Sequence, residues 1–417
     1  MTRTEPGRLY RTVGDWTTSP LFMLYADDWD TRYDEQISSV RIRRGLGEPG
    51  GGVAVSTMEV EIPEVLAFAK MTGRTMGLNM LGSTASQIAS RTGYSGDPAE
   101  LQARFKGRIG PVAVTDTGKT STSSTSLTCS SWIAREHDSR RTVTLTDDTL
   151  LDDAIASLLY NAPKHYSFTS AGPWDALAED VPDATFRDTI AKLTSDYEVL
   201  IRDRRNGGAQ ALSLTYRWAQ AQARVATTAH LTRSQAISPA SWVQDSEAAS
   251  KKFKFEMRDA QGVRWTTTRY LEEQIEPDAV TEDVDWMLFG QLTDHWDYAS
   301  RAIVHRDNVR AYNLPSVTVD LLYLLGSDNP YHRRQAGELL ALETADTINF
   351  SGDWPLALQG IQIVTGMTET ITGDEWTLEL SLAPLIHVFG HYPPQIPALV
   401  WNAATYPWNT ETRIWNH

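Results

Sequence analysis

The side chains that could supply metal chemistry are histidines and acidic residues, and their spacing favours no metal site. His387 and His391 lie four residues apart, but the nearby Pro393 argues against the helix that a zinc-binding pair requires, and the chain contains no His-Glu-x-x-His. His295 and Asp297 fall in a predicted helix and are interpreted as its solvated polar face. The acidic run at residues 27–30 lacks the spaced ligands and glycine turn of a calcium loop.

The remaining reactive residues do not form a known catalytic motif. Gly118 and Lys119 resemble the end of a phosphate-binding loop, but Ala113 stands where that motif requires glycine. Cys129 lies in a Thr/Ser-rich strand and is interpreted as a small buried residue rather than a nucleophile. Paired carboxylates for glycoside hydrolysis need no local motif and stay open. We predict a protein that is not an enzyme and that holds no cofactor and no metal.

The composition indicates an acidic protein that does not bind nucleic acid. Of the 417 residues, 38 are Lys or Arg and 53 are Asp or Glu, which gives a net charge of −15. Such a surface lacks the basic footprint of a nucleic-acid-binding protein and would repel DNA passing nearby. The single cysteine excludes an intramolecular disulfide, as suits a reducing cytoplasm. No apolar run approaches the ~20 residues of a membrane span, and the N-terminus does not resemble a signal peptide.

The elements that would position these residues are mostly β-strands. Trp376, Leu378, Leu380 and Leu382 alternate with polar residues, which predicts a strand with one buried face, joined by a turn at Gly373 to a strand over 361–372. Other predicted strands cover residues 37–45, 53–62, 105–109, 111–115, 346–350 and 316–325. Residues 117–131 are predicted to form a hairpin whose second arm is a Thr/Ser-rich strand, and the alternative, a mucin-like linker, lacks the expected proline. The predicted strands form two β-barrel-like domains, over residues 1–146 and 229–386, the second with a hairpin over 252–268, a helix over 333–344 and a long helix over 281–305.

A small α+β domain is predicted between the two β domains, over residues 147–228. Its first helix covers residues 147–159, with Asp147 or Asp148 as the cap and a stripe formed by Leu151, Ile155, Leu158 and Leu159. A second helix covers 185–197, and a hairpin follows with arms at 198–202 and 210–216. The fold class is therefore mainly β with an α+β insertion.

The C-terminal residues 387–417 are predicted to form an extended arm. Trp401, Trp408 and Trp415 are each followed by Asn at intervals of seven, and Pro407 argues against a coiled coil. Exposed indole rings carry a large apolar surface, so another surface must cover the arm. That surface belongs either to a neighbouring chain or another protein, or to the second β domain of the same chain.

Two stretches of the chain combine short motifs in a fixed order. The first combines a Leu/Ala-rich helix at 339–343, D-T-I at 346–348, G-M-T-E-T-I at 366–371 and W-T-L-E-L-S-L-A-P at 376–384. The second is S-V-R-I-R-R-G at 39–45, followed by a Gly-rich loop and a strand beginning S-T at 56–57. In these motifs the chain resembles the baseplate hub proteins at the tail tips of siphophages, a family of minor tail proteins. In domain order, the resemblance covers residues 20–384.

The resemblance implies a structural tail protein of a siphophage with an actinobacterial host. Such a hub is a homotrimer whose two barrels per chain match a six-fold tail tube and line the channel through which DNA passes without specific binding. The implied partners are the distal tail or tube protein, the tape measure and tip proteins, and the implied location is the virion tail tip, assembled in the host cytoplasm. A carbohydrate-binding receptor protein and a cell-wall hydrolase stay open as alternatives.

Arg43 and Arg44 precede the Gly-rich loop and are candidate contacts to an acidic neighbouring subunit. The alternative is a solvated strand edge that charge protects from aggregation. Trp401, Trp408 and Trp415 are the other candidate partner contacts.

Overall fold

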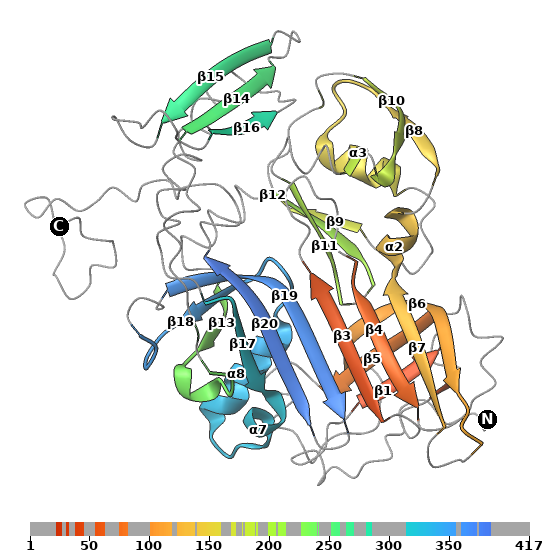
Figure 1. The fold of residues 1–417 in the computed structure, drawn as a ribbon, viewed down its shortest axis with the longest axis vertical. Coiled ribbons are helices and arrows are strands. Elements are labelled where there is room, and N and C mark those ends of the chain that lie inside the picture. The colour runs from red at the N-terminus through yellow and green to blue at the C-terminus, as the bar shows by residue number, and fades with distance from the viewer. Residues whose placement is uncertain are drawn as a thin grey trace, which may run out of the picture.

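Figure 1 shows the chain in a computed structural model. The structure describes residues 22–26, 31–32, 38–45, 55–62, 75–81, 101–118, 123–137, 140–159, 168–171, 177, 180–187, 189–190, 199–205, 207–213, 227–239, 241, 252–258, 264–270, 281–285, 314–355, 360–372 and 375–384. Residues 27–30, the histidines at 295, 387 and 391, and the arm at 387–417 lie outside these ranges, so the predictions made for them stay predictions.

The dominant feature is a 12-stranded sheet that takes strands from both ends of the chain (Figure 1). Its N-terminal strands are β1 (Phe22–Ala26), β2 (Thr31–Arg32), β3 (Ser39–Gly45), β4 (Thr57–Ile62), β5 (Thr75–Leu81), β6 (Leu101–Thr115) and β7 (Ser124–Ser131). Its C-terminal strands are β13 (Thr227–Leu231), β17 (Ser316–Asp320), β18 (Thr347–Phe350), β19 (Gly360–Thr372) and β20 (Trp376–Pro384). The N-terminal strands lie antiparallel in the order β3-β4-β7-β6-β5-β1-β2.

β19 joins the two groups of strands because it is long enough to hold two neighbours along one edge. Residues 360–363 pair with β18 and residues 366–372 pair with β3, both antiparallel. The other edge of β19 pairs with β20, which in turn pairs with β17. The two predicted β blocks therefore share one continuous sheet, and the domain limits at residues 146, 228 and 386 stay predictions.

Burial along the strands follows the predicted period of two. Trp376, Leu378, Leu380 and Leu382 are at most 4% exposed, whereas Glu375 and Glu379 are exposed. The hydrophobic cluster that they join also contains Val40, Ile42, Met58 and Val60 from β3 and β4. One core therefore holds the two groups of strands together.

The Thr/Ser-rich segment forms a strand, as predicted. β7 pairs with β6 on one side and with β4 on the other. The two strands predicted at 105–109 and 111–115 are one strand, β6, with an irregularity between Ile109 and Val112.

Two helices, α7 (Leu321–Gly326) and α8 (Pro330–Ala341), follow β17, and the strand predicted over 316–325 is wrong after Asp320. The Oδ1 atom of Asp320 accepts the N–H of Tyr323 at 2.9 Å, which caps α7 and ends the strand. Leu321, Leu322, Leu324 and Leu325 are buried in α7. A short apolar run is typical of a buried strand and of a buried helix alike, so the pattern could not separate the two. α8 begins before the predicted residue 333 because Asn329 caps it and Pro330 occupies its first position.

A separate group of elements, here called the α+β unit, lies beside the sheet (Figure 1). It comprises α2 (Trp132–His137), β8 (Thr142–Leu145), α3 (Leu151–Leu158), β9 (Phe168–Ala171), β10 (Val181–Thr185), β11 (Val199–Asp203) and β12 (Ala209–Ser213). β11 and β12 form the predicted antiparallel hairpin, β9 lies parallel to β12, and β8 pairs with β10. The unit has its own hydrophobic cluster, which includes Leu145, Leu151, Ile155, Leu158 and Ile201.

Both helices predicted for this unit begin later than expected. α3 starts at Leu151, and its N-cap residue Leu150 makes no side-chain cap. Asp148 has φ of 62°, a left-handed conformation that a helix cannot contain, so the predicted aspartate cap is wrong. The second helix was predicted from Thr185, but residues 181–185 form β10 and the helical turn starts at Phe186. The predicted stripe residues of the first helix are buried as expected.

A third group of strands corrects the start of the predicted long helix. β14 (Lys252–Arg258) and β15 (Arg264–Tyr270) form the expected antiparallel hairpin, and β16 (Thr281–Asp285) lies parallel to β14. The helix predicted over 281–305 is therefore wrong at 281–285, where pairing with β14 outweighs a weak helical periodicity. Residues 286–305 lie outside the described ranges. Among the helices described, none is long and apolar enough to cross a membrane.

Candidate functional site

The two arginines singled out in the sequence lie on opposite faces of β3. Arg43 is exposed, and its Nη1 lies 3.2 Å from Oε1 of Glu59 on β4. β3 pairs with both β4 and β19, so the interpretation of this segment as a strand edge is wrong. A role for Arg43 as a contact to a neighbouring subunit stays a prediction.

Arg44 is 4% exposed and finds its acidic partner inside its own chain. Its Nη1 donates to Oε1 of Glu369 on β19 at 3.0 Å, and its Nη2 donates to the backbone carbonyl of Arg104. Arg44 thus occupies a buried position in phase with Val40 and Ile42, where an ionic contact replaces an apolar one.

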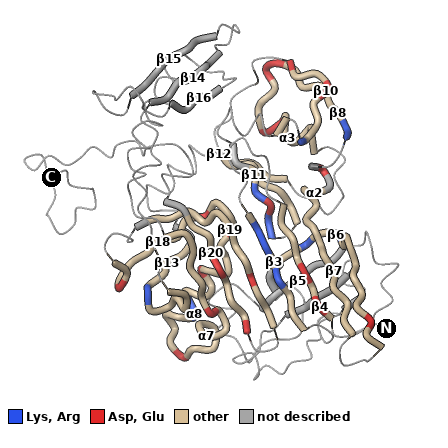
Figure 2. Tube along the Cα trace, in the orientation of Figure 1, with Lys and Arg blue, Asp and Glu red and all other residues tan. Residues whose placement is uncertain are grey.

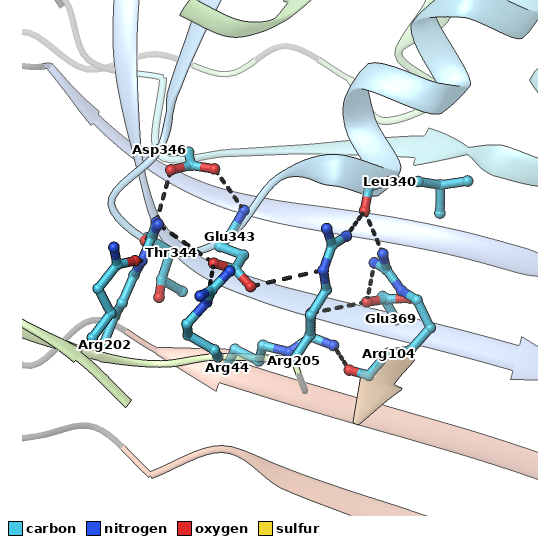
Figure 3. A network of polar contacts seen from close by, with 11 residues as sticks. Arg44, Arg104, Arg202, Arg205, Leu340, Glu343, Thr344, Asp346 and Glu369 are labelled. Atoms are coloured by element: carbon cyan, nitrogen blue, oxygen red, sulfur yellow. Dashed lines mark hydrogen bonds and ion pairs between the residues drawn. The ribbon is translucent and has the colours of Figure 1, made fainter. Parts of the chain in front are cut away.

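Arg104 on β6 holds the same carboxylate from a second direction (Figure 3). Its Nε donates to Oε2 of Glu369 at 3.1 Å, and its Nη2 donates to Oε1 at 2.6 Å. Arg104 is 1% exposed and Glu369 is 0% exposed, so the pair is removed from water. A bidentate arginine–carboxylate pair of this kind fixes geometry as well as charge.

The two guanidinium groups keep Glu369 ionised. Desolvation by burial acts to raise its pKa, but the positive charges of Arg104 and Arg44 and their hydrogen bonds outweigh that effect. The pKa of Glu369 is lowered from 4.5 to about 2. The carboxylate therefore stays charged and cannot serve as a proton donor near neutral pH.

A second cluster joins the α+β unit to the loop between α8 and β18 (Figure 3). The Nη1 of Arg202 donates to Oδ1 of Asp346 at 2.7 Å and to the carbonyl of Thr344 at 2.8 Å. Glu343 accepts ionic contacts from Arg202 and Arg204, both at 3.4 Å, and from Arg205 at 3.7 Å. The carboxylate of Glu343 thus faces three arginines, which lie at the end of β11 and in the turn that follows it.

The last carbonyls of α8 link the two clusters. The carbonyl of Leu340 accepts from Nη1 of Arg205 at 2.6 Å and also from Nη1 of Arg104. A helix leaves its last carbonyls without intrahelical partners and carries partial negative charge there, so guanidinium groups stabilise this end. Figure 2 shows basic positions on β3 and β11 where the unit meets the sheet.

Asp203, at the end of β11, is a buried carboxyl group at this junction whose pKa is shifted toward neutral pH. It is 2% exposed, and its Oδ2 accepts the backbone N–H of Ser56 at 3.1 Å. Desolvation raises the pKa of Asp203 to about 6, because the nearby hydrogen bonds and Arg44 offset the burial only in part.

The arrangement holds distant segments of the chain together through buried ionic contacts. Among the described residues no group of His, Cys, Asp or Glu could hold a metal ion. Cys129 is buried, as predicted, and desolvation raises the pKa of its thiol to about 12. A thiol that stays protonated is a poor nucleophile.

Four residues of these clusters were not predicted from the sequence: Arg104, Arg202, Glu343 and Glu369. One sequence pattern nevertheless points to Glu369. It stands in phase with Met367 and Ile371 on β19, both buried, so a carboxylate falls on an apolar face. Arg44 breaks the apolar face of β3 in the same way, and these two in-phase charges are the partners that meet. Nothing local marks Arg104 or Arg202, whose partners lie more than a hundred residues away.

No protein-family model matches the sequence, and no curated protein matches it. The fold does match solved structures. The prophage MuSo2 43 kDa tail protein from Shewanella oneidensis superposes with a TM-score of 0.56 at 10% identity, covering 88% of this chain and 99% of that one. The tail protein from Neisseria meningitidis MC58 superposes with a TM-score of 0.54 at 11% identity, covering 87% of this chain and 95% of that one.

At these identities the likeness concerns the fold. The mainly β architecture inferred from sequence is confirmed, and it is the fold of phage tail proteins. The resemblance carried by residues 39–57 and 339–384 falls on strands β3, β4, β18, β19 and β20, which lie together in the large sheet.

Proposed function

We propose that this chain is a structural minor tail protein that forms the central hub of a siphophage tail tip. The observation that carries the proposal is the extent of the fold match, since the Shewanella oneidensis tail protein is covered over 99% of its length. The match also covers 88% of this chain, so most of the chain has a counterpart in that tail protein. The hub would adapt the tail tube to the tip and surround the DNA channel.

The proposed assembly is a homotrimer around that channel. Each chain contributes two β blocks, so three chains present six similar β units to a six-fold tube. The net charge of −15 supports a role beside DNA that does not bind it, because an acidic wall repels phosphate. The proposed partners are the distal tail or tube protein, the tape measure and tip proteins of the same virion.

Arg43 and the arm are the proposed contact points. Arg43 is exposed in the single chain and bears only one ionic contact, to Glu59, among the residues described. Trp401, Trp408 and Trp415 would anchor the arm in apolar pockets, because indole rings are enriched among residues that dominate binding energy. Whether those pockets lie on a neighbouring chain or on the same chain is decided by the truncation described in the Discussion.

The oligomeric state and location test the proposal together. Mass photometry of the full chain should give three copies of the 46.5 kDa polypeptide, and an image of the particle should place them at the tail tip. A stable monomer in the particle, or a channel lined mainly by Lys and Arg, would contradict the proposed hub.

Two assays distinguish the other functions that the sequence left open. Clearing of cell wall in a zymogram would replace the structural role by a hydrolase. Retention on host glycans that is lost when residues 387–417 are removed would instead indicate a receptor-binding protein. We expect neither activity.

A further inference from the structure

The α+β unit and the C-terminal half of the sheet have separate hydrophobic cores. The cluster of the α+β unit contains no residue from 314–384, and the sheet cluster contains none from 140–213, among the residues described. The contacts between them that are described above are polar, and they run from Arg202, Arg204 and Arg205 to the loop at 340–346. A polar interface of this kind permits relative motion on this side. On the other side Val55 packs against the hydrophobic cluster of the unit and the N–H of Ser56 donates to Asp203, so the unit stays attached there.

The arginines differ in their access to water. The side chain of Arg202 is 9% exposed, whereas those of Arg204 and Arg205 are 31% and 21% exposed. Dissolved salt screens ionic contacts that reach water more strongly than buried ones. The contacts of Arg204 and Arg205 to Glu343 are therefore the part of the junction that ionic strength can weaken.

The closed arrangement also leaves a polar atom unpaired in the α8–β18 loop. Among the described residues, the Oγ1 atom of Thr344 is buried without a hydrogen-bond partner, and so is Nε of the neighbouring Arg44. Buried polar atoms without hydrogen bonds are costly, so opening to water would recover part of that cost.

We infer that the α+β unit is a hinged element, and that Arg202, Arg204 and Arg205 form an ionic latch that holds it against the α8–β18 loop. The unit keeps its internal core when the latch opens, so it moves as a body. Ionic attraction to Glu343 closes the latch, and the buried, unpaired hydroxyl of Thr344 opposes closure, so the equilibrium is sensitive to charge. The inference concerns motion within one chain and does not depend on the proposed hub function.

The test measures the distance between the unit and the sheet in the full-length chain. Spin labels are placed at Thr169→Cys on β9 and Glu379→Cys on β20, both exposed positions, while buried Cys129 stays unlabelled. Pulsed electron spin resonance is recorded at low and high salt with an excess of unlabelled chain, which suppresses distances between copies. We expect one distance at low salt and a second, longer distance that grows as salt is added.

The double substitution Arg204→Gln and Arg205→Gln should populate the longer distance already at low salt. Arg334→Gln is the matched control, because it removes an arginine–glutamate contact of the same length, 3.4 Å to Glu338, that does not involve the α+β unit. A single distance at every salt concentration in both the wild type and the double variant would overturn the inference. So would a salt-dependent distance that is the same in wild type and double variant. If the double variant does not fold, the salt series on the wild type decides alone.

Discussion

Glu369 is the residue on which the contact between the two halves of the sheet depends most. Substitution by Gln keeps the shape but leaves the buried charges of Arg44 and Arg104 without their counterion. We expect the free energy of unfolding to fall by ~3–5 kcal/mol, the range found when one partner of a buried pair is removed. Urea unfolding followed by tryptophan fluorescence measures this.

Glu379→Gln on the neighbouring strand is the control for that substitution, because its side chain is exposed and its loss should change stability by less than ~0.5 kcal/mol. Equal unfolding midpoints for the two variants would contradict the role given to Glu369.

The contribution of Glu369 to the free energy of unfolding depends on pH with a defined sign. Because the pKa of Glu369 falls from 4.5 to about 2 on folding, its contribution is present above pH 4.5 and is lost as the pH drops through about 2.

Asp203 makes the free energy of unfolding depend on pH in the direction opposite to Glu369. The pKa of Asp203 rises from 3.8 to about 6 on folding, so its ionised form disfavours the folded state. The stability linked to its protonated form is fully present below pH 3.8 and is lost as the pH rises through about 6. Asp203→Asn should therefore stabilise the chain at pH 8 by on the order of 3 kcal/mol and change little at pH 4. Thermal unfolding at the two pH values measures the difference. An equal effect at both would show that Asp203 does not titrate in this range.

At the scale of elements, β19 and β20 form the centre of the sheet and bury one face each. Leu380 on β20 is fully buried and lies opposite Met367 of β19 and Val317 of β17. Leu380→Ala should cost ~2–5 kcal/mol, because the side chains around the cavity cannot collapse completely. Ser381→Ala, at the next and exposed position, is the control for denaturant unfolding. A loss of similar size at both positions would contradict the assigned faces of the strand.

At the scale of the whole molecule, the arm at 387–417 is the segment whose partner decides assembly. Truncation after Pro384 should leave a folded chain that does not enter particles if the arm binds a neighbouring chain or tip protein. Circular dichroism of the purified chain and its content in purified virions measure the two properties. Normal incorporation would refute the assembly role, and an insoluble or unfolded product would favour docking of the arm on its own chain.

Local pattern was enough to predict many elements. The hairpins formed by β11 with β12, by β14 with β15 and by β19 with β20 follow from alternating residues and turns that contain glycine. The errors lie where local pattern is ambiguous: an apolar run that is a strand before Asp320 and a helix after it, and residues 281–285, which pair as a strand. In both places a cap or a strand partner decided between two conformations of similar intrinsic preference.

The sequence by itself determined the mainly β class, the buried face of each central strand, the acidic surface and the absence of a disulfide within the chain. These follow from residue type and short spacing. Only the tertiary structure decided that β3 pairs with β19, that Arg44 and Arg104 share Glu369, and that three arginines of the α+β unit reach the α8–β18 loop. Those contacts join residues far apart in the chain, and no local periodicity specifies which distant charge a buried charge will meet.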